Sequence, residues 1–206
     1  PGFGSSTRLI SRAVWLKDLP LLRMLGKTLA GSWQGDDARQ RDRSLELFDV
    51  SIAQHVGDDY YPADSDAWKR RTIAAFDRHV TLHYALNPDL LHVLPGRARH
   101  LPYATVDIAR FSSQPPDAAT TRPLVIAHAP SHRGAKGTAQ ILSALDALRS
   151  EGLTFELDLV EGLPRSQAIE RYARCDVMID QLYAGWYGGL AVEAMALGKP
   201  VCGYVR

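Results

Sequence analysis

Cysteine is scarce in this chain, and excess charge and long apolar runs are missing from it. The 206 residues include two cysteines, Cys175 and Cys202, and carry a formal net charge of +1. Both thiols stand in apolar, strand-adjacent surroundings, which predicts two small buried hydrophobes in a reducing, cytoplasmic compartment and no disulfide. A near-neutral chain argues against a nucleic-acid partner held by bulk electrostatics. No apolar run is long enough to span a bilayer, and we see no signal-peptide pattern.

Motifs for several other chemistries are also lacking. No G-x-G-x-x-G follows a predicted strand, which argues against a dinucleotide-binding oxidoreductase. His79 and His83 could share a helix face, but no HExxH pattern and no third ligand accompany them. We therefore expect surface or capping histidines and no metal site. Asp36 and Asp37 could form a carboxylate pair, although beside Arg39 a structural salt bridge is the favoured interpretation.

The clearest secondary-structure signals lie in the C-terminal part. Residues 112–122 are rich in Pro, Ser, Ala and Thr, which predicts a linker between a domain over 1–111 and a second domain over 123–206. After the linker, strand and helix signals alternate. Strands are predicted over 123–128, 153–160, 176–181 and 200–205, and helices over 137–150, 165–174 and 189–197. This alternation is typical of an α/β fold with a parallel sheet and right-handed crossovers.

The N-terminal part gives weaker signals. Helical spacing predicts a helix over 16–25, and a short strand follows over 27–33. Residues 34–65 are expected to form a long loop with one or two helical turns. A clearer helix begins at Asp66, and a shorter one is predicted over 87–94.

A glycine-rich loop precedes the last predicted helix. Gly188 and Gly189 let the backbone turn sharply and approach a ligand. The helix begins at Leu190 with free N–H groups, which suit an anion or a ring of hydroxyls. Glu193 stands one turn into this helix, where its carboxylate can accept hydrogen bonds from the hydroxyls of a ribose. Taken alone, the pattern is more often an ordinary connection in an α/β domain.

A second loop follows the apolar run 123–130. Ser131, Arg133 and Lys136 stand between a predicted buried strand and the start of a helix. Two cations together with a helix dipole make a site for a diphosphate. A solvated basic loop is the alternative, and with a second glycine loop in the chain the two interpretations are equally favoured.

Five short motifs follow one another in residues 122–206. They are His128-Ala-Pro-Ser131 with Arg133 and Lys136-Gly-Thr138, Leu159-Val-Glu-Gly162, Asp180-Gln-Leu182, Gly185-Trp-Tyr-Gly188, and Val192-Glu-Ala-Met-Ala-Leu-Gly-Lys-Pro-Val201. Together they resemble the nucleotide-sugar half of a retaining GT-B glycosyltransferase, in the "glycosyl transferases group 1" family. Less strongly, Gln34-Gly-Asp-Asp-Ala-Arg39 is similar to that family's histidine-glycine-x-aspartate-x-arginine loop, and 101–111 to the segment that leads into its second domain.

The resemblance implies a GT-B-like fold, with a Rossmann-like donor domain and part of an acceptor-side α/β domain. It implies a hexosyltransferase-like enzyme that moves a sugar from a nucleotide-diphosphate sugar to an acceptor, with retention and without a metal or further cofactor. A non-catalytic nucleotide or nucleotide-sugar binding module is the alternative. Because enzymes of this family are longer, we expect the chain to be a fragment. A peripheral membrane contact through a missing N-terminal region is left open.

The resemblance also implies roles for individual residues. Arg133 and Lys136 are expected to neutralise the donor diphosphate and to stabilise it as a leaving group, and Glu193 is expected to hold the nucleotide ribose. The donor is expected to be lined by Ser131, Gly188, Gly189 and Leu190.

Two positions depart from the family's pattern. The first glutamate of its paired-glutamate motif falls at Gly185, so a carboxylate that contacts the donor sugar is missing. Its N-terminal histidine falls at Gln34, which cannot act as a general acid or base. Both departures favour the binding-module alternative. Glu161, beside the place where the family seats the nucleobase, is expected to point to solvent. Trp186 and Tyr187 could stack on a sugar or cap the core.

Overall fold

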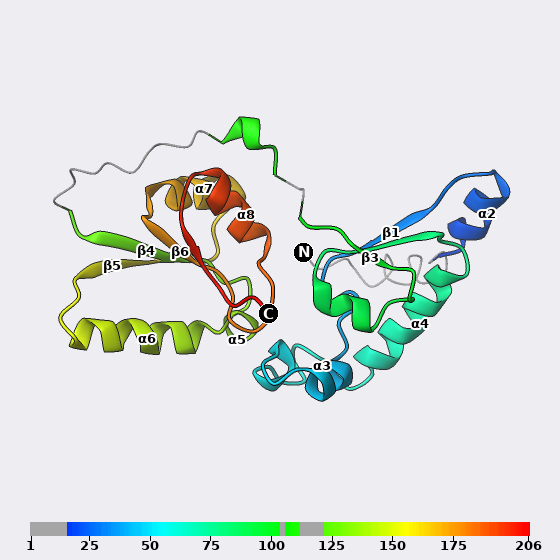
Figure 1. Ribbon diagram of the computed structural model, residues 1–206, viewed down its shortest axis with the longest axis horizontal. Helices are drawn as coiled ribbons and strands as arrows, with labels where there is room; N and C mark the ends of the chain where they lie inside the picture. The colour runs from blue at the N-terminus through cyan, green and yellow to red at the C-terminus, as the bar shows by residue number, and fades with distance from the viewer. Residues whose placement is uncertain (1–15, 104–105, 112–121) are drawn as a thin grey trace. The chain divides into compact units, whose positions relative to one another are not determined.

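The computed structural model describes residues 16–103, 106–111 and 122–206, which fall into two compact units. Unit 1 takes in the described residues up to Arg43 and Ala63–Pro102, and unit 2 takes in those of Ser44–Pro62 and Tyr103–Arg206. Each unit contains a parallel sheet, so an α/β fold with two parallel sheets is confirmed (Figure 1). The linker predicted over 112–122 lies outside the described residues apart from Arg122, so that boundary stays a prediction. Among the described residues, no helix has the length and apolar character needed to cross a membrane.

Unit 2 is a doubly covered parallel sheet. Its strands, in the order β5-β4-β6-β7, are all parallel to their neighbours. They are β4 (Leu124–His128), β5 (Phe155–Leu159), β6 (Val177–Ile179) and β7 (Val201–Cys202). The helices that connect them are α5 (Arg133–Lys136) and α6 (Thr138–Ser150), α7 (Arg165–Arg174), and α8 (Gly189–Ala196). The predicted alternation of this part is thus confirmed, with shorter strands than predicted.

Helices cover both faces of this sheet (Figure 1). On one face, α6 packs Ile141 and Leu145 against Ile126 of β4 and Phe155 of β5. On the other face, α7 and α8 pack around Met178 of β6, which is fully buried. The apolar spacing that predicted α6 therefore marks the face it buries.

The strand order of unit 2 changes direction at β4. From β4 the chain moves through α6 to β5 on one side of the sheet. It then crosses through α7 to β6 on the other side of β4 and continues through α8 to β7. The connections that leave β4 and β6 therefore run in opposite directions. The carboxyl ends of these two strands form the topological switch point, where open α/β sheets bind ligands.

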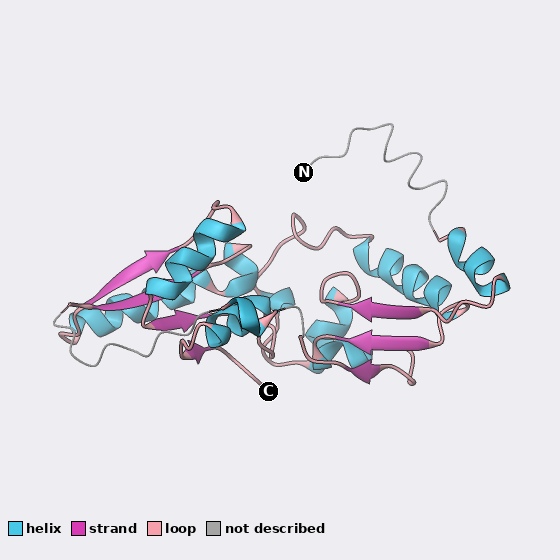
Figure 2. Cartoon of the chain, turned by 90° about the horizontal axis from the view of Figure 1, so that it is seen from above, coloured by secondary structure: helices cyan, strands magenta, loops and turns pink. Residues whose placement is uncertain are grey.

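Unit 1 contains a smaller sheet, whose strands run parallel in the order β1-β2-β3 (Figure 2). The strands are β1 (Ala30–Trp33), β2 (Leu82–Ala85) and β3 (Arg99–His100). The helical segments are α2 (Asp18–Met24), α4 (Ser65–Asp77), the 3-10 helix η2 (Pro88–His92) and the first residues of α3 (Arg41–Leu47). Ile73 of α4 packs against Trp33 and Ala85 of the sheet. Strands β2 and β3 were not predicted, because they are short and place polar side chains where an apolar run would be the signal.

Residues 44–62 belong to unit 2 through their packing. After α3 they form the 3-10 helix η1 (Ile52–Gln54), in keeping with the predicted loop with one or two helical turns. Ile52 and the fully buried Tyr61 pack in one cluster with Ala135 of α5 and with Tyr183. A further 3-10 helix, η3 (Ile108–Arg110), precedes the undescribed residues.

His79 and His83 do not share a helix face, and the expectation of a surface or capping histidine is wrong for His83. Helix α4 ends at Asp77, and His83 lies on β2. His83 is buried, and its Nδ1 accepts a hydrogen bond of 3.2 Å from Trp33 Nε1. Burial, with the nearby Arg97 charge, lowers the pKa of His83. No group of three metal-ligating side chains occurs among the described residues.

The two cysteines differ in their surroundings. Both are free thiols, but only Cys175 is buried, so the expected burial of Cys202 is wrong. Strand β7 is a two-residue strand at the edge of the sheet, and Cys202 is its last residue, which leaves the side chain exposed. Burial raises the pKa of the Cys175 thiol to about 11, which keeps it protonated and unreactive.

The core of unit 2 can be tested with two methionines. Met178 is 0% exposed, whereas Met195 of α8 is 50% exposed. We expect Met178→Ala to lower the free energy of unfolding by about 2–5 kcal/mol, because it leaves a cavity among β6, α7 and α8. Met195→Ala should change it by less than about 0.5 kcal/mol. Urea unfolding of both variants measures the difference, and equal losses would contradict the packing described here.

Candidate functional site

Two of the residues predicted to bind a donor, Lys136 and Gly188, lie with three polar residues at the carboxyl edge of the unit 2 sheet. Lys136 follows β4, Glu161 follows β5, and Asp180 and Gln181 follow β6. Gly188 caps the start of α8. Because parallel strands all end at the same edge, these side chains come together although they lie far apart in sequence. This edge includes the topological switch point.

Asp180 is the central polar group of this edge. Its side chain is 1% exposed, and its Oδ2 accepts a hydrogen bond of 2.7 Å from the backbone N–H of Gly188. Its Oδ1 lies 3.5 Å from Lys136 Nζ. A Cβ at Gly188 would lie 3.4 Å from both Lys136 Nζ and Asp180 Oδ2, so glycine gives the ion pair its room. One buried carboxylate thus holds both a cation and the start of a helix.

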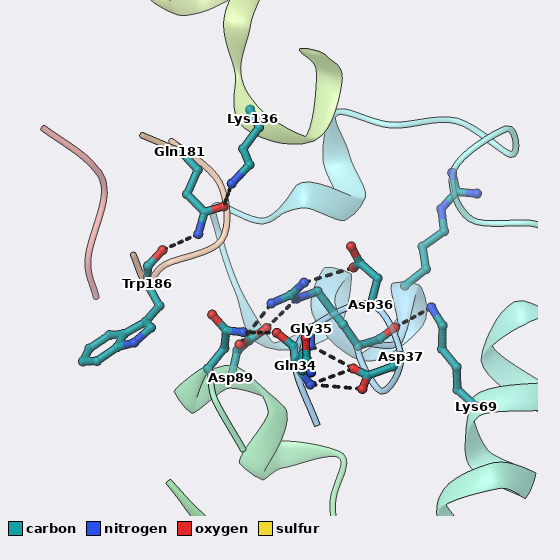
Figure 3. Close-up of polar contacts among 12 residues, drawn as sticks. Gln34, Gly35, Asp36, Asp37, Lys69, Asp89, Lys136, Gln181 and Trp186 are labelled. Atoms are coloured by element: carbon teal, nitrogen blue, oxygen red, sulfur yellow. Dashed lines mark hydrogen bonds and ion pairs between the residues drawn. The ribbon is translucent and has the colours of Figure 1, made fainter. Parts of the chain in front are cut away.

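Gln181 connects the same lysine with the glycine-rich loop. Its Oε1 accepts a hydrogen bond of 2.5 Å from Lys136 Nζ, and its Nε2 donates one of 2.6 Å to the backbone carbonyl of Trp186 (Figure 3). The Lys136 side chain is 18% exposed. The ammonium group is therefore held in place from two sides while part of the side chain stays accessible.

Arg133, at the start of α5, forms a two-pronged ion pair with Glu161. Its Nε lies 2.9 Å from Oε1, and its Nη2 lies 2.5 Å from Oε2. The hydrogen bonds between them raise the pKa of Arg133 and lower the pKa of Glu161, so both groups stay charged. Glu161 is exposed, as expected, but its carboxylate contacts Arg133, which the sequence did not predict.

The two cations of α5 are held by different partners. They stand three residues apart, a spacing that places side chains on one helix face. Arg133 nevertheless reaches Glu161 after β5, whereas Lys136 reaches Gln181 after β6. Since β5 and β6 flank β4 on opposite sides, the two head groups are drawn apart across the end of β4. Their joint action on one diphosphate stays a prediction.

The turn before α5 is set by a residue that sequence reasoning did not single out. His132 Nδ1 accepts a hydrogen bond of 3.2 Å from the backbone N–H of Ala135 and so caps the helix. Ser131, a predicted donor-binding residue, is exposed just before it. Gly137 joins α5 to α6 with φ of +78°, and a Cβ there would approach Leu182 to 3.0 Å. The cap and the glycine together fix the short helix that carries both cations.

Glu193, the predicted ribose ligand, is bound to an arginine. Arg165 Nε donates to Glu193 Oε1 at 3.0 Å, and Nη2 donates to the same oxygen at 2.5 Å. The second carboxylate oxygen takes no part in these two bonds. The Glu193 side chain is 16% exposed, and that of Arg165 is 68% exposed. Burial and the Glu193 charge raise the pKa of the neighbouring Tyr172.

His128, part of the first motif, has a structural role. It is fully buried, and its Nδ1–H donates to the carbonyl of Ile179 over 2.9 Å. Its Nε2 can therefore accept the hydroxyl proton of Thr138, 2.9 Å away. Burial lowers the pKa of His128, which keeps the ring neutral. The imidazole ties β4 to β6 and to the start of α6.

The loop before α8 has a left-handed backbone at Gly185, which favours glycine over any residue with a side chain. The backbone there has φ of +67°, and an ideal Cβ would lie 2.5 Å from Arg206 Nε. The Arg206 guanidinium also lies over the Phe48 ring, 3.5 Å from its centroid. Trp186 and Tyr187 are half-buried and stack with ring centroids 4.8 Å apart.

The loop after β1 in unit 1 has its own ion-pair network. The predicted salt bridge is confirmed, since Arg39 Nη1 lies 3.0 Å from Asp36 Oδ1. The buried partner of Arg39 is Asp89 of η2, with Nε 2.6 Å from Oδ2, which the sequence did not predict. Asp37 accepts a hydrogen bond of 3.0 Å from the backbone N–H of Gln34 and so closes the turn (Figure 3).

Comparison with known proteins adds no family assignment. The chain matches no protein-family model, and no curated protein matches it. The motif resemblance therefore stays an interpretation of the residues, beside an α/β structure with two parallel sheets.

The role of Asp180 can be measured as stability. Asp180→Ala leaves the Gly188 N–H without its acceptor and removes the charge that faces Lys136, so we expect a loss of about 3 kcal/mol in the free energy of unfolding. Asp146→Ala on α6 is the matched control, because its side chain is 73% exposed. Urea unfolding that gives the same small loss for both variants would rule out the central role of Asp180.

Proposed function

We propose that unit 2 binds the diphosphate of a nucleotide-sugar at the carboxyl edge of its sheet, and that the protein transfers the sugar to an acceptor, with retention and without a metal. One observation carries the proposal. The topological switch point between β4 and β6 is occupied by a partly accessible cation, Lys136, next to the first turn of α8. A cation beside a helix N-terminus at a switch point is an arrangement that binds phosphates.

The first turn of α8 supplies the backbone part of this site. Asp180 takes the N–H of Gly188, while the N–H groups of Gly189 and Leu190 have no preceding helical carbonyl to donate to. Both residues are half-buried, and the helix dipole favours negative charge at this end. We assign these two N–H groups to a phosphate oxygen, with Lys136 as the neighbouring counter-charge.

The chemistry needs a stabilised leaving group. When the sugar leaves, negative charge develops on the phosphate oxygen that held it. Fixed positive groups at that position stabilise the developing charge, which is the largest contribution in many enzymes. In our proposal Lys136 and Arg133 supply these positive groups, and the hydrogen bond from Lys136 to Gln181 keeps the lysine oriented beforehand.

We assign the ribose to Glu193. Its Oε2 takes no part in the bonds from Arg165, and the side chain lies on the first turns of the same helix as the proposed phosphate site. A carboxylate oxygen in that position can accept hydrogen bonds from adjacent hydroxyls. The sugar, the base and the acceptor stay outside the proposal.

A non-catalytic nucleotide-binding module is the second candidate. It is favoured by Gly185, because a glycine with φ of +67° stands where the family's pattern has a glutamate, so no carboxylate contacts a donor sugar from this position. The two candidates differ in turnover. Incubation with UDP- and GDP-sugars, followed by detection of released nucleoside diphosphate, distinguishes them, since the binding module releases none.

The phosphate site is tested by removing each cation. We expect Lys136→Ala and Arg133→Ala each to weaken binding of UDP, GDP or ADP by about 1.5–3 kcal/mol, the usual contribution of a charged hydrogen bond. Arg174→Ala on the exposed side of α7 is the matched control. Calorimetry should show little change for nucleosides without phosphate. If both variants bind diphosphates as tightly as the wild type, the phosphate site does not involve α5.

The ribose assignment is tested with a double-mutant cycle. Ribonucleoside diphosphates and their 2′,3′-dideoxy analogues are compared on the wild-type chain and on Glu193→Gln, which keeps the shape but loses the charge. We expect the loss of the hydroxyls to cost the wild type at least about 1 kcal/mol more than the variant. A coupling near zero together with a lower melting temperature would make Glu193 a structural partner of Arg165.

A further inference from the structure

We propose that Glu161 competes with the ligand for Arg133, so that a diphosphate has to displace the Glu161 carboxylate before it can use this arginine. The inference rests on the proposed phosphate site. It adds a residue that sets how tightly a second phosphate is held. It starts from the finding that both cations of α5 already have partners, which differ in burial and in position.

The first argument is geometric. Glu161 occupies Nε and Nη2 of Arg133, the edge of the guanidinium with which arginine also grips a phosphate through two parallel bonds. Carboxylate and phosphate therefore cannot both take this edge. A ligand phosphate that binds Arg133 in the same two-pronged way must replace Glu161.

The second argument concerns which of the two ion pairs can open. The Arg133 and Glu161 side chains are 58% and 33% exposed, so water solvates both groups when they separate. Asp180 is 1% exposed and also holds the Gly188 N–H, so its pairing with Lys136 cannot be given up without leaving buried groups unsatisfied. Exposed pairs contribute little to stability. Arg133 is therefore the mobile cation, and Lys136 is the fixed one.

The third argument concerns the backbone. Glu161 directly follows Val160, which is buried and donates its N–H to the carbonyl of His128 over 2.9 Å. The next residue, Gly162, has φ of +67°, and a Cβ there would meet nothing within 4 Å. The main chain before Glu161 is thus fixed to the sheet, whereas the residue after it faces open space, and the Glu161 side chain is itself 33% exposed. The carboxylate can turn away without a change in the sheet.

A difference between ligands follows from these arguments. A monophosphate bound at Lys136 and the first turn of α8 leaves the Arg133–Glu161 pair intact. A diphosphate whose second phosphate reaches Arg133 must open it. Glu161 should therefore weaken the binding of nucleoside diphosphates and leave monophosphates unaffected. In a transferase, the same competition would help a nucleoside diphosphate product to leave.

The test uses Glu161→Gln, which keeps the size of the side chain and removes its charge. The control is Glu170→Gln, an exposed carboxylate on α7. Calorimetry with UDP, GDP and ADP, with their monophosphates and with inorganic pyrophosphate should show diphosphates binding about two- to fivefold more tightly to Glu161→Gln. Monophosphate affinity should match that of the control variant. In an Arg133→Ala background this gain in diphosphate affinity should vanish, because Glu161 then has no arginine to compete for.

The outcomes separate this inference from the proposed function. If the wild-type chain binds none of the diphosphates, the phosphate site itself is wrong. If the wild type binds them and Glu161→Gln binds them no better, the site stands and the competition is refuted. A gain that persists in the Arg133→Ala background would refute it as well, because that gain would come from general charge and not from the arginine. Far-UV circular dichroism confirms that each variant is folded.

Discussion

The buried carboxylate of Asp180 is the constraint on which the candidate site depends. A charge with 1% exposure is stable only when it is paired and hydrogen-bonded, and its two partners are the Gly188 N–H and the ammonium of Lys136. By satisfying Asp180, the fold brings the start of α8 and the cation of α5 to one place. The arrangement that we propose binds phosphate is thus a consequence of burying one acid at the end of β6.

Charge balance decides how this edge responds to a ligand. Lys136, Arg133 and Arg165 each face a carboxylate of the same unit. An anion that binds there meets cations that are already paired, so it has to compete with a carboxylate for at least one of them. The affinity for the anion then depends on the ion pair that opens most easily. By its exposure, that is the pair of Arg133 or of Arg165 and not the buried pair of Lys136 with Asp180. This distinguishes a site with fixed and mobile cations from a simple basic patch.

Much of unit 2 could be predicted from sequence, because its signals are local. Helix α7 has the predicted bounds of residues 165–174, and the apolar spacing of α6 marks the face it buries. Strands β2 and β3 were not predicted because they have only four and two residues. Each includes polar side chains, so neither shows a periodic apolar signal. The ion pairs escaped for another reason. Arg133 and Glu161 are 28 residues apart, and only the parallel pairing of β4 with β5 brings them together.

The central claim is that phosphate binds where the start of α8 meets Lys136. Nuclear magnetic resonance of the chain, titrated with UDP, GDP and ADP, tests it most directly through the backbone N–H signals of Gly189 and Leu190. The account predicts that these two signals shift together and saturate with a nucleoside diphosphate, and that they hardly move with the nucleoside alone. If a nucleoside diphosphate binds while both signals stay in place, the ligand lies elsewhere and the account is wrong.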